Sequence, residues 1–391
     1  MLNNLFTKLE SYYDEMVSIR RHLHQHPELS FQEYNTARFI QDYYEKLNIE
    51  VKGQVGGNGV VAKVNGKLPG RTVALRADFD ALPIQDEKDV PYKSLVPGVM
   101  HACGHDGHTA TLLVLAKTLH ELKDELEGSY VFIHQHAEEY APGGAATMIE
   151  AGCLEGVDVI FGTHLWASES IGTIQYRTGP MMAAADRFEI EIQGKGGHGA
   201  QPHKTQDAIV TASQLVVNLQ QIVSRKVNPV DAAVVTVASL IAENAFNVIA
   251  DKAKLSGTVR TFKEDVRHFI EGEMERIIHG TCYTSGSSYQ FDYFRGYPPV
   301  VNHEKETEQL IRSAQFVPEV TNIEETEPEM GGEDFSYYLE KVPGTFFFTG
   351  AKPVREENGF PHHHPKFDIE EKAMLIAAKT LGSAALSVHN N

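Results

Sequence analysis

The stretch RTVALRADFD, residues 71–80, begins as a short run of β-forming residues and ends in two carboxylates, Asp78 and Asp80. After it comes HTATLLVLAKTLHELKDEL, residues 108–126, in which apolar residues recur at helical spacing. A buried strand followed by an amphipathic helix is the repeating unit of α/β proteins. We therefore read residues 71–80 as one strand of an α/β sheet.

Three further stretches have the same apolar, β-forming character: GSYVFIHQHAEE (128–139), VDVIFGTHLW (157–166) and GTFFFTGA (344–351). Continuous apolar strands that alternate with helices predict a mostly parallel sheet with helices on both faces. The first 45 or so residues alternate polar and apolar at helical spacing. They predict two helices, with a break at His26-Pro27.

The pattern changes near residue 180. The stretch DRFEIEIQGKG (186–196) alternates strictly, as a half-exposed strand does. Further elements are expected at about 207–225 (helix), 232–241 and 250–260 (strands), 263–281 (helix) and 288–296 (strand). This β-α-β-β-α-β order predicts an inserted ferredoxin-like α+β domain. We expect it to span 181–296 and to divide the larger domain into 1–180 and 297–391.

Composition excludes several classes of protein. The 391 residues carry a net charge of −18, which disfavours nucleic acid as a partner. Three cysteines, Cys103, Cys153 and Cys282, are too few and too scattered for a disulfide framework. The N-terminal residues do not resemble a signal peptide, and no apolar run is as long as a membrane span. We expect a cytoplasmic protein with reduced thiols and no membrane partner.

Metal-ligand residues fall where the predicted strands end. Asp78 and Asp80 follow one strand, Glu138 and Glu139 follow another, and His164 ends a third. In open α/β sheets, binding sites form beyond the carboxyl ends of the strands. We therefore expect these residues to converge in space.

The loop MHACGHDGHTA (100–110) adds Cys103 and His105 in front of the predicted helix. A thiolate and an imidazole two residues apart suit Zn²⁺, and also Mn²⁺, Co²⁺ or Ni²⁺ once carboxylates join them. The alternative for Cys103 is a small buried hydrophobic residue. Flanking histidines favour the metal ligand.

The pair Glu138-Glu139 indicates a hydrolytic role. At a strand end one carboxylate is able to bind metal while the other accepts a proton from a water that the metal makes acidic. The alternative is a solvated acidic loop. Placement after a buried strand favours the functional interpretation.

Two histidine-containing loops remain. In GFPHHHPKFD (359–368) we expect one metal ligand among His362, His363 and His364. In GKGGHGAQPH (194–203), within the insert, four glycines leave His198 projecting, and an imidazole is able to donate to a developing oxyanion. For both loops a solvated surface role is the alternative.

Together these stretches resemble a known family. The matching motifs, in order along the chain, are LHQHPELSFQE, LRADFDALP, MHACGHDGHTA, HQHAEE, THLW, GHGAQPH, GTVRTF, GGEDFS and HHHPKFD. From about residue 20 to about 375 they resemble the amidohydrolase branch of the aminoacylase/carboxypeptidase metallopeptidase superfamily. That branch includes hippurate hydrolases, auxin-conjugate hydrolases and N-acetyl-diaminopimelate deacetylases.

The resemblance implies a catalytic α/β domain with a dinuclear metal site, and a lid domain that commonly dimerises. It implies five metal ligands: Cys103, His105, Glu139, His164 and His363. Glu138 would be the general base, and His198 the oxyanion donor, reaching the site from the partner subunit in related enzymes. Asp80 would orient a ligand rather than bind metal itself.

Asn247 and Arg260 match a pair that binds the substrate carboxylate in related amidohydrolases. Arginine suits this role because its planar guanidinium forms two hydrogen bonds with a carboxylate. The alternative for Arg260 is a surface ion pair. The chain departs from the family at Ala167, where proline is usual. It departs again in its three consecutive histidines. Spacing from Pro365 indicates His363 as the metal ligand, with His362 and His364 as alternatives.

We expect hydrolysis of N-acyl amino acids to a carboxylate and a free amino acid. Two divalent ions are expected per chain, Mn²⁺ or Zn²⁺, with Co²⁺ or Ni²⁺ as alternatives. A homodimer through the lid domain is expected. Two other functions stay open: a dipeptidase or aminopeptidase on the same metal site, and a non-catalytic protein that binds amino-acid conjugates.

Overall fold

The computed structural model describes residues 1–354 and 359–390. It divides into two compact units, each with its own hydrophobic core. The larger unit comprises Met1–Gly179, Val301–Glu327 and Asp334–Asn391, and the smaller comprises Pro180–Val300 and Pro328–Glu333.

The unit boundaries differ in detail from those expected. The sequence pattern placed all of 297–391 in the larger domain, whereas residues 297–300 and 328–333 cluster with the smaller unit. Backbone pairing holds the second of these segments, because the Ala183 N–H donates to the Glu329 carbonyl at 3.0 Å. Such pairing between distant segments leaves no mark on local sequence periodicity.

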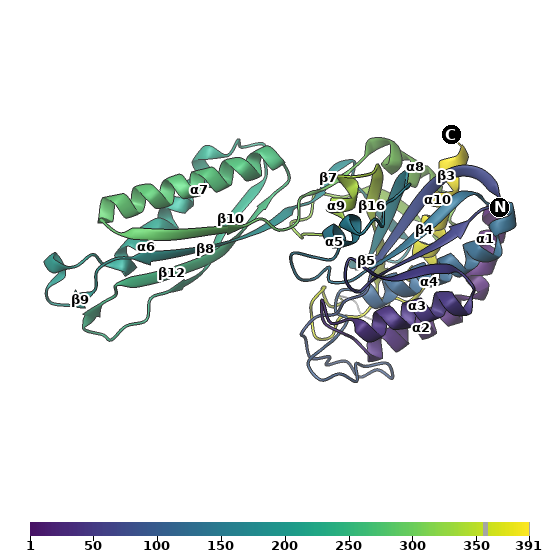
Figure 1. Ribbon diagram of the computed structural model, residues 1–391, viewed down its shortest axis with the longest axis horizontal. Helices are drawn as coiled ribbons and strands as arrows, with labels where there is room; N and C mark the ends of the chain where they lie inside the picture. Colours follow the sequence, from purple (N-terminus) through teal and green to yellow (C-terminus); the bar gives the residue numbers. More distant parts are fainter. Residues whose placement is uncertain (355–358, 391) are drawn as a thin grey trace. The chain divides into compact units, whose positions relative to one another are not determined.

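The larger unit is built on an eight-stranded sheet (Figure 1). In spatial order its strands are β1 (Glu50–Val55), β2 (Gly59–Asn65), β4 (Glu127–Gln135), β3 (Leu68–Asp78), β5 (Val159–Ser170), β16 (Gly344–Lys352), β6 (Thr173–Tyr176) and β15 (Asn322–Glu325). The central strands β4, β3, β5 and β16 run parallel, and β1 and β2 add antiparallel strands at one edge. These central four are the strands expected from the sequence, so the mostly parallel sheet is confirmed.

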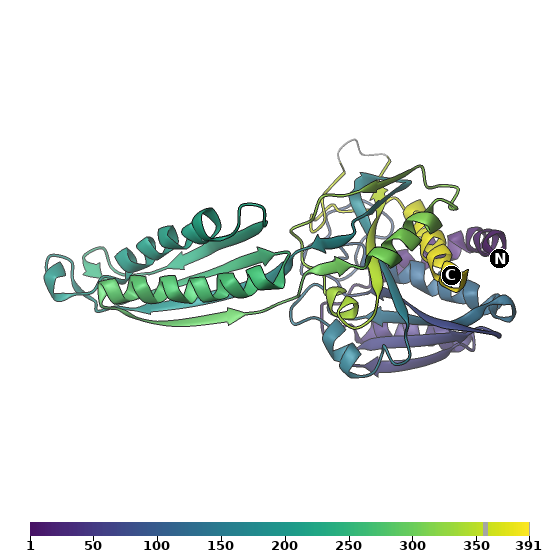
Figure 2. The same ribbon diagram turned by 90° about the horizontal axis from the view of Figure 1, so that it is seen from above.

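Helices cover both faces of this sheet, as predicted (Figures 1 and 2). They are α1 (Leu2–Ser11), α2 (Tyr13–Gln25), α3 (Tyr34–Lys46), α4 (His105–Glu121), α5 (Ala145–Glu150), α8 (Glu304–Ala314), α9 (Ser336–Leu339) and α10 (Lys372–Ser387). Helices α4 and α10 pack in the main core on one face, and α4 is buried along most of its length. The short α5 lies on the other face with α9, where the Tyr338 hydroxyl contacts Met148 Sδ at 3.9 Å.

The N-terminal residues form three helices, and the expectation of two was wrong. A one-residue break at Tyr12 (φ −102°, ψ 9°) separates α1 from α2. Apolar spacing continues nearly unchanged across a single residue, so periodicity alone does not detect the break. The break expected at His26-Pro27 is present, because α2 ends at Gln25 and α3 begins at Tyr34.

The smaller unit has the expected β-α-β-β-α-β order on a four-stranded antiparallel sheet. Its elements are β8 (Ala184–Gln193), α6 (Ala208–Leu219), β10 (Ala233–Ile241), β12 (Lys252–Thr261), α7 (Glu264–Ser285) and β13 (Ser288–Phe294). The two helices pack into one core with the sheet, and β8 alternates in burial as a half-exposed strand does. A short strand pair, β9 (Gly197–His198) with β11 (Val248–Ile249), also belongs to this unit. A second short pair, β7 (Gly179–Met182) with β14 (Val300–Asn302), includes residues of both units.

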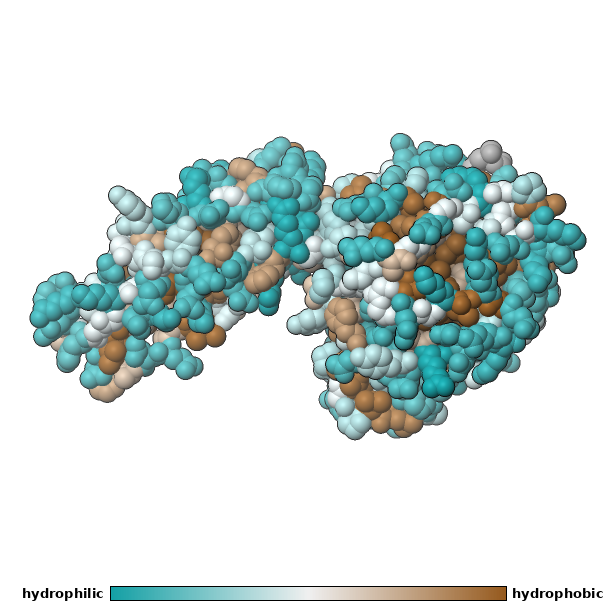
Figure 3. Space-filling view, viewed as in Figure 1, coloured by the Kyte–Doolittle hydropathy of each residue, from teal (hydrophilic) through white to brown (hydrophobic). Residues whose placement is uncertain are grey.

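The surface facing the viewer in Figure 3 is largely hydrophilic on both units. Hydrophobic residues gather in the middle of the larger unit's visible face, on the side that carries α5 (Figures 1 and 3). Among residues 1–354 and 359–390, no helix combines the length and the apolar composition that a bilayer crossing requires.

A buried ion pair fixes α7 against the smaller sheet. Arg267 of α7 donates to both carboxylate oxygens of Asp186 in β8, at 2.8 and 2.5 Å. The same carboxylate accepts from the Tyr293 hydroxyl at 2.8 Å and from the Gly296 N–H at 2.9 Å. Both side chains of the pair are almost fully buried, so neither charge has water as a substitute partner.

Replacing Arg267 with alanine should therefore lower the free energy of unfolding of the smaller unit by about 3 kcal/mol, because Asp186 would be left charged and buried. Hydrogen exchange of the α7 amides in the full chain measures this. Arg276→Ala on the same helix is the matched control, since its pair with Glu273 is exposed and its loss should hardly change exchange. Equal exchange in the two variants would contradict this assignment.

Candidate metal centre

The ligand-type residues named from the sequence meet at the carboxyl ends of the parallel strands. Asp78 ends β3, His164 lies in β5, and His105 begins α4. Ligand atoms of Cys103, His105 and Glu139 lie within 4.8 Å of one another, as do those of Cys103, His164 and His362. The convergence expected at this edge of the sheet is therefore present in the larger unit.

Two histidines direct Nε2 into this cluster, because Nδ1 of each ring is bonded to an oxygen. The His105 Nδ1–H donates to the Asp80 carboxylate at 3.1 Å, and the His164 Nδ1–H donates to the Leu165 carbonyl at 3.0 Å. In each neutral ring the lone pair then belongs to Nε2. His164 Nε2 lies 3.4 Å from Cys103 Sγ, while buried His105 Nε2 has no hydrogen-bond partner among the described residues.

A third nearby histidine, His108, has both ring nitrogens occupied. Its Nδ1 lies 2.6 Å from Asp78 Oδ1, and its Nε2 accepts the Leu165 N–H at 2.9 Å. A nitrogen that accepts a backbone N–H has no lone pair left for a metal. His108 therefore supports the site by fixing Asp78 and β5, a role that the sequence did not reveal.

The three consecutive histidines have different surroundings. His363 Nε2 lies 3.3 Å from Glu139 Oε2, and the His363 N–H donates to the Ala102 carbonyl at 2.8 Å, which joins this loop to that of Cys103. His362 Nδ1 lies 3.8 Å from Cys103 Sγ. His364 stacks on Phe360 instead, with ring centroids 4.5 Å apart.

The turn that carries Glu138 and Glu139 is held in an uncommon backbone conformation. Ala137 has φ +52°, a left-handed value that costs a non-glycine residue energy unless its surroundings fix it. Glu33, which is fully buried, accepts the Ala137 N–H at 2.9 Å, and Asp80 accepts the Glu139 N–H at 2.9 Å. Glu33 ends the motif LHQHPELSFQE, but nothing in the sequence connected it with this turn.

The electrostatics of the cluster favour a cation. Burial, and then the carboxylates of Glu139 and Glu138, raise the pKa of the Cys103 thiol well above its usual range. Burial alone would lower the pKa of His105, but the carboxylates of Asp78 and Asp80 outweigh it and raise that pKa to about 10. Protons on sulfur and imidazole thus occupy the places that a divalent ion would take.

The residues therefore fit a metal site on two grounds. The donor set mixes sulfur, nitrogen and carboxylate oxygen, as Zn²⁺ and Mn²⁺ sites do. Buried His105 Nε2 and Glu139 Oε1 both lack a hydrogen-bond partner among the described residues, although they lie only 3.8 Å apart. An ion between them would satisfy both atoms.

The remaining expected site residues belong to the smaller unit. His198 lies on β9, and its Nδ1 accepts the Ala200 N–H at 3.0 Å, so the ring hydrogen is on Nε2. Asn247 lies beside it, since its carbonyl accepts the Gly199 N–H at 2.8 Å.

Asn247 and Arg260 are not brought together within the smaller unit. Asn247 precedes the first residue of β12, and Arg260 is near the last, where its Nε–H donates to the Met330 carbonyl at 3.2 Å. Eight residue steps of extended strand separate Lys252 from Arg260, a distance of about 26 Å. One small substrate cannot contact both side chains of the same chain.

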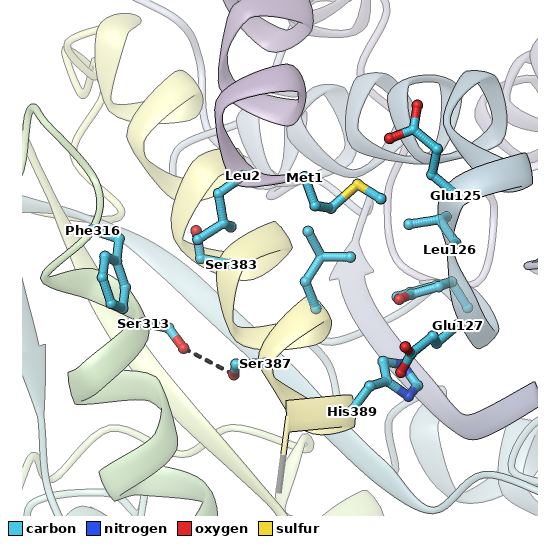
Figure 4. Close-up of a pocket in the computed structure, with 12 residues that line it drawn as sticks. Met1, Leu2, Glu125, Leu126, Glu127, Ser313, Phe316, Ser383, Ser387 and His389 are labelled. Atoms are coloured by element: carbon cyan, nitrogen blue, oxygen red, sulfur yellow. Dashed lines mark hydrogen bonds between the residues drawn. The ribbon is translucent and has the colours of Figure 1, made fainter. Parts of the chain in front are cut away.

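A separate pocket lies at the opposite edge of the larger sheet (Figure 4). Its volume is about 280 Å³, and its lining includes Glu127, the first residue of β4, and Ser387, the last of α10. Ser313 and Ser387 hydrogen bond to each other across 3.0 Å. The ligand-type residues are at the carboxyl ends of the strands, so this pocket is not the candidate metal centre.

Comparison with known proteins agrees with this geometry. The sequence pattern of Peptidase family M20/M25/M40 matches residues 74–387. The chain is 60% identical over 382 residues to the protein YhaA of Bacillus subtilis (strain 168), covering 98% of this chain and 96% of that one. It is 49% identical over 291 residues to an N-acyl-L-amino acid amidohydrolase of Geobacillus stearothermophilus, covering 74% and 79% respectively.

Among solved structures, the YXEP protein of Bacillus subtilis, a dinuclear metal binding peptidase from the M20 family, superimposes with a TM-score of 0.85 at 36% identity. That alignment covers 97% of this chain and 99% of the other. The metallopeptidase resemblance read from the sequence motifs is confirmed. The chain belongs to Peptidase family M20/M25/M40.

Proposed function

We propose that the protein hydrolyses the amide bond of N-acyl amino acids, N-acetyl amino acids among them, to a carboxylate and a free amino acid. The observation that carries this proposal is the placement of two neighbouring carboxylates, Glu138 and Glu139, against the same imidazole. His105 Nε2 lies 3.9 Å from Glu138 Oε2 and 3.8 Å from Glu139 Oε1. One carboxylate is thereby available to a metal and the other to a proton.

The relatives support an acylated amino acid as the substrate. One is an N-acyl-L-amino acid amidohydrolase, and another, 41% identical over 377 residues, is an N-acetyl-L-cysteine deacetylase of Bacillus subtilis (strain 168).

Two divalent metal ions complete the proposed site, Mn²⁺ or Zn²⁺, with Co²⁺ or Ni²⁺ as alternatives. The proposed ligands are Cys103, His105, Glu139, His164 and His363. When bound, the ions would polarise the substrate carbonyl and make the attacking water more acidic. Asp80 would fix the His105 ring through its Nδ1–H, as carboxylates behind metal-binding histidines do. A cytoplasmic location would keep Cys103 reduced.

Glu138 would act as general base and then as general acid. It would take the proton of the attacking water, and later deliver that proton to the leaving nitrogen, so that the amino acid departs as a neutral amine. His198 would donate its Nε2–H to the oxyanion that forms on the carbonyl oxygen. The observed acceptance by His198 Nδ1 supports this role, because it assigns the hydrogen to Nε2.

The separation of Asn247 and Arg260 supports the proposed homodimer. If both contact one substrate carboxylate, they must come from different chains, because the strand from Lys252 to Arg260 alone spans about 26 Å and Asn247 precedes it. Arg260 would come from one subunit, and Asn247 with its neighbour His198 from the other. The interface is assigned to the smaller unit, which carries these residues.

The substrate class is tested with N-acetyl amino acids set against unblocked dipeptides. The proposal predicts release of free amino acid from the first group and little from the second. Faster cleavage of dipeptides would indicate a dipeptidase or aminopeptidase instead. Saturable binding of both groups without product, in metal-loaded protein, would indicate a binding protein.

In the same assay Glu138→Gln should lower kcat by about 10²–10⁴-fold, because the amide cannot accept the proton of water. Metal content should stay at the wild-type level, since Glu138 is not among the proposed ligands. Glu150→Gln, on the exposed side of α5, is the matched control and should be fully active. Near-normal turnover of metal-loaded Glu138→Gln would remove the general base from the mechanism.

Mixed dimers test whether His198 acts across the subunit interface. Glu138→Gln and His198→Ala chains, co-expressed with different tags, should regain about one quarter of wild-type activity. Half of the randomly assembled dimers are mixed, and each mixed dimer has one complete site. Mixing Glu138→Gln chains with Cys103→Ser chains should restore no activity, because each chain then has a defect in its own metal cluster. A lack of recovery in the first mixture, with dimers present, would place His198 in its own chain's site.

A further inference from the structure

We propose that His362 is a hydrogen-bond donor to the Cys103 sulfur rather than a metal ligand, and that the backbone N–H of Ala167 holds it in that role. The inference rests on the proposed function in one respect, since it takes Cys103 as a metal-binding thiolate. It goes beyond that function because it assigns a role to the additional histidine and to Ala167, the two departures from the family pattern.

The contacts of His362 define its orientation. Its Nε2 accepts the Ala167 N–H at 3.2 Å, and its Nδ1 lies 3.8 Å from Cys103 Sγ, within hydrogen-bond range of a sulfur atom. The ring packs between Trp166 and Phe367, with centroids 4.7 and 5.0 Å away. Four neighbours from three segments of the chain thus fix one small ring.

The position of the ring hydrogen follows from these contacts. A neutral imidazole has one N–H and one lone pair. Because Nε2 faces a backbone donor, the lone pair is on Nε2 and the hydrogen is on Nδ1. A protonated Nδ1 has no lone pair for a metal, so it donates to the sulfur.

The same reasoning distinguishes four histidines of the cluster. His105 and His164 donate from Nδ1 to oxygen and keep a lone pair on Nε2 for a metal. His108 and His362 accept a backbone N–H at Nε2 and have none to offer. The cluster of Cys103, His164 and His362 therefore contributes two ligand atoms and one donor.

Ala167 makes this arrangement available. The donor is a backbone N–H, which proline lacks, so a proline at position 167 could not donate to His362. With alanine there, the strand β5 supplies both the metal-binding His164 and the donor that orients His362. The departure at Ala167 and the third histidine thus have one explanation.

A donor to the sulfur changes how the thiolate binds metal. A hydrogen bond draws electron density from sulfur and lowers the energy of its donor electrons. In protein loaded with Co²⁺, the charge-transfer absorption from thiolate to metal reports this energy directly. Loss of the donor should move the band to longer wavelength.

The test compares Co²⁺-loaded wild type with His362→Phe, which keeps the packing against Trp166 but has no N–H. The inference predicts a band at longer wavelength with the wild-type number of ions per chain. Ala167→Pro should move the band in the same direction, because His362 loses the bond that fixes its tautomer. His364→Phe, in the same histidine run, is the matched control and should leave the band unchanged.

Two results would overturn the inference. Loss of an ion in His362→Phe would make His362 a ligand, and an unmoved band with full metal content would remove its bond to sulfur. Failure of the proposed metal site looks different, because wild-type protein would then bind Co²⁺ without any thiolate band. Metal content and band position are both read without measuring turnover.

Discussion

A buried excess of carboxylate at one edge of the parallel sheet is the constraint on which the rest of the structure depends. Asp78, Asp80 and Glu139 all approach His105, and removing such charges from water costs several kcal/mol each unless they are paired. Arg76 pairs with Asp78 at 2.6 Å, which compensates part of the excess negative charge. Imidazoles, backbone N–H groups and the proposed ions compensate the remaining negative charge. The same carboxylates therefore affect both the stability of the fold and the chemistry of the site.

The direction of its hydrogen bonds, rather than its distance from the cluster, decides whether a histidine is able to bind a metal. Several rings lie close to Cys103 and His105, but the partner of the second nitrogen decides which of them has a lone pair for a metal. Carbonyl or carboxylate partners at Nδ1 favour metal binding through Nε2, as for His105 and His164. Backbone N–H partners at Nε2 exclude it, as for His108 and His362.

Much of this could be predicted from the sequence because the signals are local. Apolar strands that end in carboxylates predict a sheet edge, and the pair Glu138-Glu139 is visible by itself. The three-histidine run is different, because identical neighbours are distinguished only by the folded loop, in which His363 has φ +66° and bonds to Ala102. The roles of Glu33 and of the Ala167 N–H depend on contacts between distant segments. Asn247 and Arg260 are close in sequence, but an extended strand lies between them, so their short spacing did not indicate how far apart they lie.

The central claim is that this edge of the sheet binds a pair of metal ions. The most direct test is the number of metal ions per chain, counted by mass spectrometry in protein purified without chelator and with Cys103 reduced. The account predicts about two ions per chain, with fewer in Cys103→Ser. A wild-type protein that binds no stoichiometric metal under these conditions would contradict the account.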